Sequence, residues 1–269
     1  MPKTISIIIS TYNSSKSLNL VLKSYCRQKE KNFEVIIADD GSTDETALVI
    51  QNFKNYLAIK HVWHEDKGFR KCTILNKAAL EATGDYLIFT DGDCLAPPNF
   101  VYEHKNNMRE GFYLSGGYYK LNRITTEQIG PEQVENGEAF NLAFLHKLGQ
   151  PKSRKDLLLW SKNWRLNALC NVLIPTKATF NGNNSSVYKA DLMAVKGFNE
   201  LMGYGGEDRE FGYRLKNLGI KSKRIRYTNA AVHLEHSRQY VSSQIQIQNK
   251  RIIETTKACR IVVTENGLL

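Results

Sequence analysis

The sequence predicts an α/β protein with a mostly parallel central sheet flanked by helices. Strand-like and helix-like segments alternate through the first hundred residues, which is the pattern of a doubly wound sheet. The strand-like segments are apolar along their whole length, as expected for strands that helices cover on both faces. A chain of 269 residues with 42% hydrophobic content can bury the core that such a fold requires.

Each element of this half is predicted from its own residue pattern. Short apolar runs rich in β-branched residues predict strands over residues 4–10, 33–39, 57–63 and 86–91. Apolar residues at helical spacing predict helices over residues 14–28, 41–53 and 73–82. The second helix begins with Ser42 and Glu45, which stand three residues apart as in a capping box.

The alternation is lost over residues 120–177 and returns after residue 178. We interpret the middle segment as an insertion or lid. Its mixture of leucine, tryptophan and basic residues suits a helix packed on the core, a contact with an acceptor or a membrane surface, and the packed helix is the preferred interpretation. Further along, Phe211, Leu215 and Leu218 share a helical face, and Gly219 follows as a C-terminal cap.

Composition limits the classes of function. Five cysteines without a CxxC pair argue against a disulfide framework or a zinc cage and indicate a reducing, cytoplasmic location. No segment approaches the ~20 apolar residues of a membrane span. The net charge of +10 favours an anionic membrane surface or a polyphosphate as partner, weighed evenly against plainly solvated lysines. Nucleic acid is not an expected partner, because no basic helix with interleaved aromatic residues stands out.

Polar clusters follow three of the four predicted strands, at residues 10–13 (STYN), 39–42 (DDGS) and 91–94 (DGDC). Because the carboxyl ends of parallel strands meet at one edge of a sheet, we expect these clusters to form a ligand site. Asp91 and Asp93 stand two residues apart, and like charges this close call for a positive neighbour. A divalent cation, Mg²⁺ or Mn²⁺, would supply that charge and would bridge to substrate phosphates.

His233 and His236 are candidates for completing such a cation site. They stand three residues apart, so on a helix or turn they would share a face and could enclose a metal together with Asp93. Imidazole ligands would favour Mn²⁺ over Mg²⁺. The alternative is a pair of surface histidines with no ligand.

Gly205 and Gly206 precede Glu207 and Asp208 at the start of the predicted helix. A carboxylate at a helix N-terminus is stabilised by the helix dipole, so this stretch is either a simple acidic helix start or the location of a general base. Capping does not require the glycine pair, which allows close backbone approach, and we therefore favour the general base.

Taken together, the motifs STYN, ADDGSTDET, FTDGD and YGGEDREFGYRL resemble those of the family 2 glycosyltransferases, which have the GT-A fold. The segment from NGNN to HSR is similar to the C-terminal part of the β-1,4-galactosyltransferases and of bacterial chondroitin-type polymerases. The resemblance covers residues 3–120 and 178–238. It implies one GT-A catalytic domain over residues 1–238, followed by a helical tail over residues 239–269. Within the domain, residues 1–120 form the nucleotide-binding half, residues 120–177 the insert or lid, and residues 178–238 the half for acceptor and catalysis.

The resemblance also implies roles for individual residues. The implied donor-binding residues, with Asp40 as the partner of a uracil imide, are Ser10, Tyr12, Asn13, Asp40, Arg70, Asp91 and Gly92. The implied residues for acceptor or sugar are Tyr204, Gly205, Gly206 and Glu207. Asp208 is the implied catalytic base, and the implied metal ligands are Asp93, His236 and His233. Tyr204 stands where the galactosyltransferases carry a tryptophan, so the sugar stays open.

The implied activity is inverting, metal-dependent transfer of a sugar of the Gal, GalNAc or GlcNAc type from a UDP-sugar, with Mn²⁺ or Mg²⁺ as cofactor. The implied acceptor is a hydroxyl of a glycan or lipid-linked saccharide in bacterial surface polysaccharide synthesis, with the protein peripheral at the inner face of the membrane. One module of a processive polymerase and a non-catalytic nucleotide-sugar-binding protein remain alternatives. A nicotinamide-dependent oxidoreductase is disfavoured, because the first strand–helix turn, STYNSSKS, contains no GxGxxG.

Overall fold

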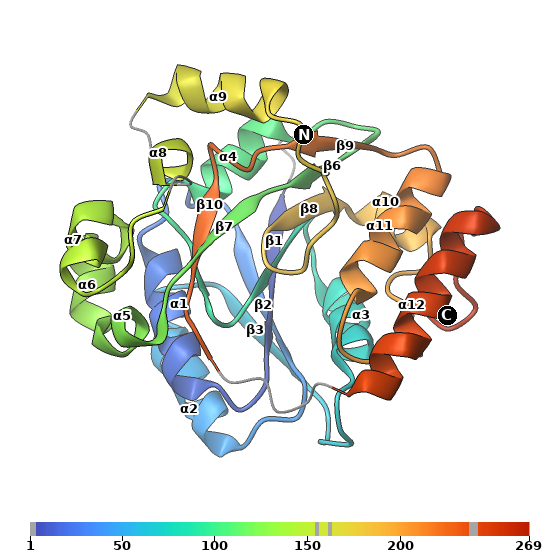
Figure 1. The fold of residues 1–269 in the computed structure, drawn as a ribbon. Helices are drawn as coiled ribbons and strands as arrows, with labels where there is room; N and C mark the ends of the chain where they lie inside the picture. Colours follow the sequence, from blue (N-terminus) through green and yellow to red (C-terminus); the bar gives the residue numbers. More distant parts are fainter. Residues whose placement is uncertain (1–3, 154–155, 161–162, 237–241, 269) are drawn as a thin grey trace.

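The computed structural model describes residues 4–153, 156–160, 163–236 and 242–268. In these residues the main sheet has the strand order β3-β2-β1-β4-β8-β6-β9 (Figure 1). Its strands are β1 (Ile5–Thr11), β2 (Glu34–Asp39), β3 (Ile59–Trp63), β4 (Tyr86–Asp91), β6 (Phe112–Ser115), β8 (Ser185–Tyr188) and β9 (Lys221–Arg224). A smaller sheet has the order β5-β10-β7, built from β5 (Cys94–Leu95), β7 (Gly117–Lys120) and β10 (Ala230–His233).

Among the described strands of the main sheet, β8 is the one that runs opposite to the others. The four strands predicted from the sequence, β1 to β4, pair in parallel, and the register places Ser10 of β1 opposite Asp91 of β4. β8 then pairs antiparallel with both β4 and β6. The mostly parallel sheet, with its helices, confirms the predicted α/β class of the GT-A type.

Helices cover both faces of this sheet, as the apolar strands require. Along β1 the side chains of Ile7 and Ile9 pack with α1 (Ser15–Cys26), whereas Ile8 packs on the opposite face with α3 (Lys71–Glu81). All three isoleucines are fully buried. The remaining helices around the sheet are α2 (Asp44–Phe53), α4 (Phe100–Asn107), α10 (Lys189–Ala194), α11 (Glu207–Asn217) and α12 (Ser243–Ala258).

The middle segment forms short helices instead of strands. They are α5 (Arg123–Gln128), α6 (Pro131–Asn136), α7 (Leu142–Lys147), α8 (Asp156–Leu159) and α9 (Trp164–Leu173), with a 3₁₀ turn, η1 (Glu138–Phe140). Figure 1 shows α5 to α7 gathered beside α1. Arg27 of α1 donates a hydrogen bond to the carbonyl oxygen of Val134 (2.6 Å), and Lys23 pairs with Glu135 (2.7 Å). This part of the middle segment is therefore attached to α1.

The C-terminal helix α12 packs along α11 (Figure 1). Thr256 of α12 donates a hydrogen bond to Glu210 (2.9 Å), and the same carboxylate pairs with the fully buried Arg214. Asn217 at the end of α11 reaches back to the carbonyl oxygen of Thr256 (3.1 Å). The C-terminal helix α12 is thus bonded to α11. None of the described helices is long and apolar enough to cross a bilayer.

Two local predictions have different outcomes. The capping box predicted for α2 is wrong: the N-cap is Thr43, and no side chain caps the helix. Ser42 instead accepts a hydrogen bond from the backbone of Asn13 (2.8 Å), because the loop after β1 lies against it. The predicted end of α11 is confirmed, since Gly219 follows the last turn with φ = +99°, a conformation that favours glycine.

Candidate functional site

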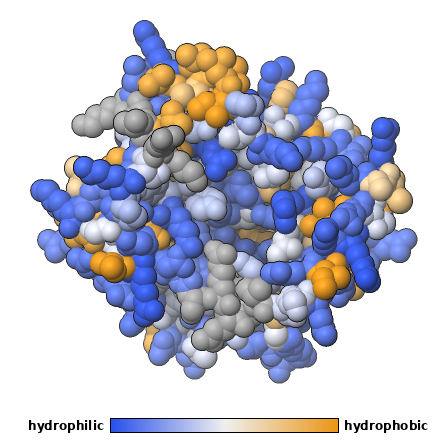
Figure 2. All heavy atoms as spheres, in the orientation of Figure 1, coloured by the Kyte–Doolittle hydropathy of each residue, from blue (hydrophilic) through white to orange (hydrophobic). Residues whose placement is uncertain are grey.

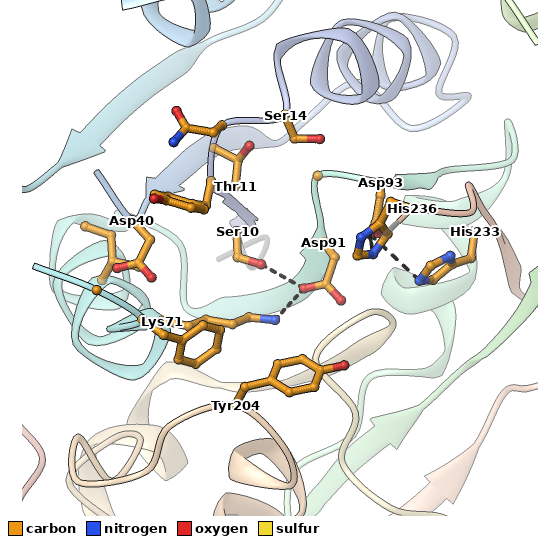
Figure 3. Close-up of a pocket in the computed structure, with 16 residues that line it drawn as sticks. Ser10, Thr11, Ser14, Asp40, Lys71, Asp91, Asp93, Tyr204, His233 and His236 are labelled. Atoms are coloured by element: carbon orange, nitrogen blue, oxygen red, sulfur yellow. Dashed lines mark hydrogen bonds and ion pairs between the residues drawn. The ribbon is translucent and has the colours of Figure 1, made fainter. Parts of the chain in front are cut away.

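A pocket of about 480 Å³ opens where β1, β2 and β4 end (Figure 3). Segments far apart in the sequence meet there, as the three polar clusters predicted. Ten of the predicted site residues line it: Ser10, Tyr12, Asn13, Asp40, Asp91, Gly92, Asp93, Tyr204, His233 and His236. The remaining five are not among the described residues that line the pocket: Arg70, Gly205, Gly206, Glu207 and Asp208.

Asp91 is held by two partners at the end of β4. Its Oδ1 accepts a hydrogen bond from Ser10 Oγ (2.7 Å), the residue opposite it on β1, and lies 2.6 Å from Lys71 Nζ (Figure 3). Burial would lower the pKa of Lys71, but Asp91 and then Glu207 outweigh burial and raise it, so the lysine is charged. Gly92 lets the chain pass close to β1, because a Cβ there would lie 3.0 Å from the Ser10 carbonyl oxygen.

Asp93 faces both predicted histidines. Its Oδ2 lies 2.9 Å from His236 Nε2 and 3.8 Å from His233 Nε2. His233 ends β10, which pairs with Cys94 of β5, and His236 lies in the loop that follows, so strand pairing and not a helix brings them to Asp93. Burial alone would raise the pKa of Asp93, but the His236 hydrogen bond and the charges of both histidines hold it below its usual value.

These residues fit a divalent cation. His233 Nδ1 is buried and has no hydrogen-bond partner among the described residues, so its imidazole is available to a ligand. One carboxylate and two imidazoles form a donor set that Mn²⁺ accepts more readily than Mg²⁺. Cys94 lies in the same cluster, but burial raises the pKa of its thiol, which donates a hydrogen bond to Asp93 (3.2 Å).

The loop before α11 carries the predicted base. Gly205 and Gly206 adopt φ values of +112° and +92°, which side chains disfavour, and this turn lets Gly205 N donate to the Glu207 carboxylate (2.9 Å). From α12, the buried Asn249 side-chain amide donates to the carbonyl oxygens of Gly203 (2.9 Å) and Gly205 (3.0 Å). The C-terminal helix therefore fixes the loop that leads to Asp208.

Asp208 lies close to the Asp91–Lys71 pair although it does not line the pocket. Its Oδ2 accepts a hydrogen bond from Gly182 N (3.1 Å), and a Cβ on Gly182 would lie 3.5 Å from Lys71 Nζ and 3.9 Å from Asp91 Oδ1. Burial and the charge of Glu207 raise the pKa of Asp208 to about 6, against the opposing Gly182 hydrogen bond and Lys71 charge. A carboxylate with a pKa raised in this way is suited to accept a proton near neutral pH.

Asp40 is one of two buried acids in the second cluster, beside Asp39. Its Oδ1 lies 2.7 Å from His64 Nε2, and its Oδ2 accepts a hydrogen bond from Arg70 N (2.9 Å). Burial raises the pKa of Asp40. The guanidinium of Arg70 bonds to the carbonyl oxygen of Glu65, so in the part of the chain that the structure describes it is the Arg70 backbone that bonds to a predicted donor residue.

Tyr12 and Asn13 hold the rim of the pocket. The Tyr12 hydroxyl donates to Asp66 (2.8 Å), and Asn13 Oδ1 accepts a hydrogen bond from Thr43 N (3.0 Å). Asn13 has φ = +44°, a left-handed conformation that asparagine tolerates better than most residues. These bonds join the loop after β1 to the start of α2 and to the segment before α3.

Lys71 and Phe69 are site residues that the sequence motifs did not identify. Both line the pocket, and the Phe69 ring contacts Tyr204 edge to face, with ring centroids 5.8 Å apart. The stretch KGFRKC contains three cationic residues, Lys67, Arg70 and Lys71, and the start of the helix determines which of them reaches the strand ends. Lys71 is the first residue of α3, where its side chain turns toward the strand ends.

Two family models match the chain, described as Glycosyl transferase family 2 over residues 6–160 and as N-terminal domain of galactosyltransferase over residues 171–237. The chain is 31% identical over 235 residues to validoxylamine A glucosyltransferase of Streptomyces hygroscopicus subsp. jinggangensis, covering 80% of this chain and 52% of that protein. It is 29% identical over 230 residues to chondroitin synthase of Escherichia coli, covering 80% and 32%. The chain thus spans about half or less of the length of these relatives.

Solved structures show the same fold at low sequence identity. TarS 1–349 of S. aureus in complex with UDP-GlcNAc matches with a TM-score of 0.65 and 19% identity, covering 96% of this chain and 70% of that one. A mannosyltransferase of Pyrobaculum calidifontis in complex with GDP-Man and Mn²⁺ matches with a TM-score of 0.62 and 17% identity, covering 97% and 65%. Because the first family model covers more than half of the chain, this protein belongs to glycosyl transferase family 2.

Proposed function

We propose that this protein transfers a sugar from a UDP-sugar, with inversion, to a hydroxyl group of a glycan or lipid-linked saccharide. The observation that carries the proposal is the placement of three acids close together, two on the pocket edge and Asp208 just outside it. Asp93 lies beside two imidazoles, Asp91 pairs with Lys71, and Asp208 lies across Gly182 from the Asp91–Lys71 pair. A nucleotide-sugar transferase needs these groups for the diphosphate, the donor sugar and the attacking hydroxyl.

The residues divide between donor and chemistry. Asp40 would accept the imide N–H of uracil, and Ser10 with Tyr12 would border the base and ribose. Asp93, His233 and His236 would hold a divalent cation, which would neutralise the charge that develops on the leaving diphosphate. Lys71 would act on the same charge, either from its contact with Asp91 or after moving toward the phosphates. Arg70 would contact the donor nucleotide after its side chain moves away from Glu65.

Asp208 would be the general base. Its carboxylate would take the proton of the acceptor hydroxyl while the oxygen forms a bond to the anomeric carbon. The bond from that carbon to the diphosphate oxygen breaks, and UDP leaves with the bonding electrons. Attack from the face opposite the leaving group converts an α-linked donor into a β-glycoside. Tyr204, Glu207 and the glycine pair Gly205–Gly206 would border the acceptor side.

Relatives guide the choice of substrates without fixing them. TarS binds UDP-GlcNAc in one solved complex, and chondroitin synthase names a polysaccharide product, so we propose a donor of the Gal, GalNAc or GlcNAc type and a surface polysaccharide acceptor. We also propose that the protein is cytoplasmic and associates peripherally with the inner face of the membrane. One module of a processive polymerase is the second candidate, because the relatives are longer than this chain.

A donor screen tests the proposal. The chain is incubated with UDP-Gal, UDP-GalNAc, UDP-GlcNAc, UDP-Glc and GDP-Man, each with Mn²⁺ or Mg²⁺, and the released nucleoside diphosphate is measured. We expect UDP release from at least one UDP-sugar, faster with Mn²⁺, and little GDP. Binding of UDP without release from any UDP-sugar would favour a non-catalytic binding protein. Absence of both binding and release would contradict the donor class.

A further inference from the structure

Helix α9 presents its apolar side to solvent and its polar side to the protein. Leu166, Leu169 and Leu173 are 45%, 51% and 67% exposed, whereas Asn167 is 7% exposed. An amphipathic helix on a globular protein normally has the opposite orientation. Figure 1 shows α9 at the outer edge of the molecule, and Figure 2 shows hydrophobic residues gathered at that place.

Polar contacts hold α9 in this orientation. Arg224 of β9 donates hydrogen bonds to the carbonyl oxygens of Val172 (3.0 Å), Ile174 (2.6 Å) and Thr176 (3.0 Å) at the end of the helix. Asn171 accepts a hydrogen bond from Tyr227 N (2.9 Å). Because the asparagine face and the helix end are bonded to the protein, the leucine face is left to meet another apolar phase.

The charge of the sequence segment that contains α9 identifies that phase. Residues 139–180 contain one acidic residue, Asp156, which is buried. The same segment contains seven basic residues: Lys147, Lys152, Arg154, Lys155, Lys162, Arg165 and Lys177. A net charge of +6 therefore lies in this segment, out of +10 for the whole chain. A second copy of the chain would bring the same positive charge to the contact, whereas an anionic membrane surface would neutralise it.

We propose that α9 is the membrane-contact helix of this protein and lies in the interface of an anionic bilayer. Leu166, Leu169, Val172 and Leu173 enter the acyl boundary, and exposed basic residues of α9 and of the segment after it, Arg165 and Lys177, contact lipid phosphates. The proposal names the surface and the lipid charge behind the membrane association proposed above. Its test requires no nucleotide sugar, so it can fail or succeed independently of the transferase activity.

The test is flotation of the full chain with vesicles of phosphatidylcholine alone or mixed equally with phosphatidylglycerol. Leu169→Gln/Leu173→Gln is compared with Leu48→Gln/Leu80→Gln, whose leucines are 66% and 52% exposed on α2 and α3. We expect the wild type to bind mixed vesicles and not phosphatidylcholine alone. The α9 variant should lose about tenfold or more in partitioning, and the control less than about twofold.

Three results would overturn the proposal. The wild type could fail to float with mixed vesicles, or the two double variants could lose binding equally. The wild type could also elute as a dimer that only the α9 variant dissociates, which would assign the surface to a second copy. Because all four leucines are exposed, both variants should keep the melting temperature and the UDP release of the wild type, which checks that folding and the catalytic site are intact.

Discussion

Lys71 Nζ lies 2.6 Å from Asp91 Oδ1, and this ion pair occupies the position between the strand ends where the donor diphosphate is proposed to bind. The ion pair supplies the positive charge that one of the two neighbouring aspartates at the end of β4 needs. Asp91 is neutralised by a lysine of the chain itself, whereas Asp93 faces two imidazoles. The two acids therefore have separate counter-charges.

Replacing Lys71 should reduce catalysis strongly. Lys71→Met removes the positive charge nearest to Asp91, so the leaving diphosphate loses a stabilising partner and Asp91 is left uncompensated. We expect kcat/KM for donor turnover to fall by about 10²-fold. Lys67→Met is the matched control, because Lys67 is an exposed lysine four residues away that pairs with Glu65. A Lys71 variant that keeps the kinetics of this control would contradict the assignment.

The raised pKa of Asp208 predicts that kcat/KM decreases on the acid side of the pH profile. Its pKa of about 6 means that the base becomes protonated below that pH, so kcat/KM should fall about tenfold per pH unit there. The folded pKa lies above the unfolded value of about 3.9, so the folded state holds this proton more tightly and the free energy of unfolding falls as the pH rises from about 4 to about 6.

Asp208→Asn should consequently be stabilised at pH 7. Urea unfolding at pH 7 should show a gain of roughly 1–2 kcal/mol over the wild type, because the variant buries an amide where the wild type buries a charge. At pH 4 the two proteins should unfold together. Equal stability at both pH values would show that the environment of Asp208 does not disfavour its ionised form.

Metal binding should depend on the Asp93 cluster. Mn²⁺ titrations followed by electron paramagnetic resonance should show affinity reduced by about tenfold or more in His236→Gln and in His233→Gln, since each removes an imidazole that faces Asp93. His146→Gln serves as the control, because His146 pairs with Asp156 in the insert. Unchanged affinity in His233→Gln alone would remove His233 from the ligand set and leave His236 in it.

Asn249 should affect turnover through the loop that it holds. Asn249→Asp cannot donate to the carbonyl oxygens of Gly203 and Gly205, so we expect kcat to fall about tenfold while the KM for donor stays within about twofold. Asn217→Asp is the matched control: Asn217 also donates to two carbonyl oxygens, those of Thr256 and Ile261, but it does not touch the loop. If both variants lose stability and kcat alike, the role of Asn249 is only structural.

The first half of the fold was predictable from the sequence because its strands are long, apolar and β-branched. Isoleucines such as Ile7, Ile8 and Ile9 leave little alternative to a strand buried on both faces. The second half was not predictable in the same way. β6, β8 and β9 have four residues each, and β8 reads SSVY, so tertiary pairing and not composition makes them strands.

Site residues that belong to a recognisable motif were predictable from the sequence. Site residues that depend on a helix boundary or on a contact between distant segments were not. Ser10, Asp91 and Asp93 follow from strand ends that must share one edge of the sheet. Lys71 required the exact start of α3, which sequence patterns fix only within a few residues. The part played by Asn249 required knowledge of a contact across 44 residues, for which the local sequence offers no signal.

The most direct test of the account compares wild type and Asp208→Asn with the same UDP-sugar in Mn²⁺. Donor affinity is measured by calorimetry and turnover by UDP release. We predict a dissociation constant within about twofold of the wild type and a loss of turnover of about 10³-fold or more, because only the proton acceptor is removed. Turnover that survives the substitution would contradict the assignment of Asp208 as the base.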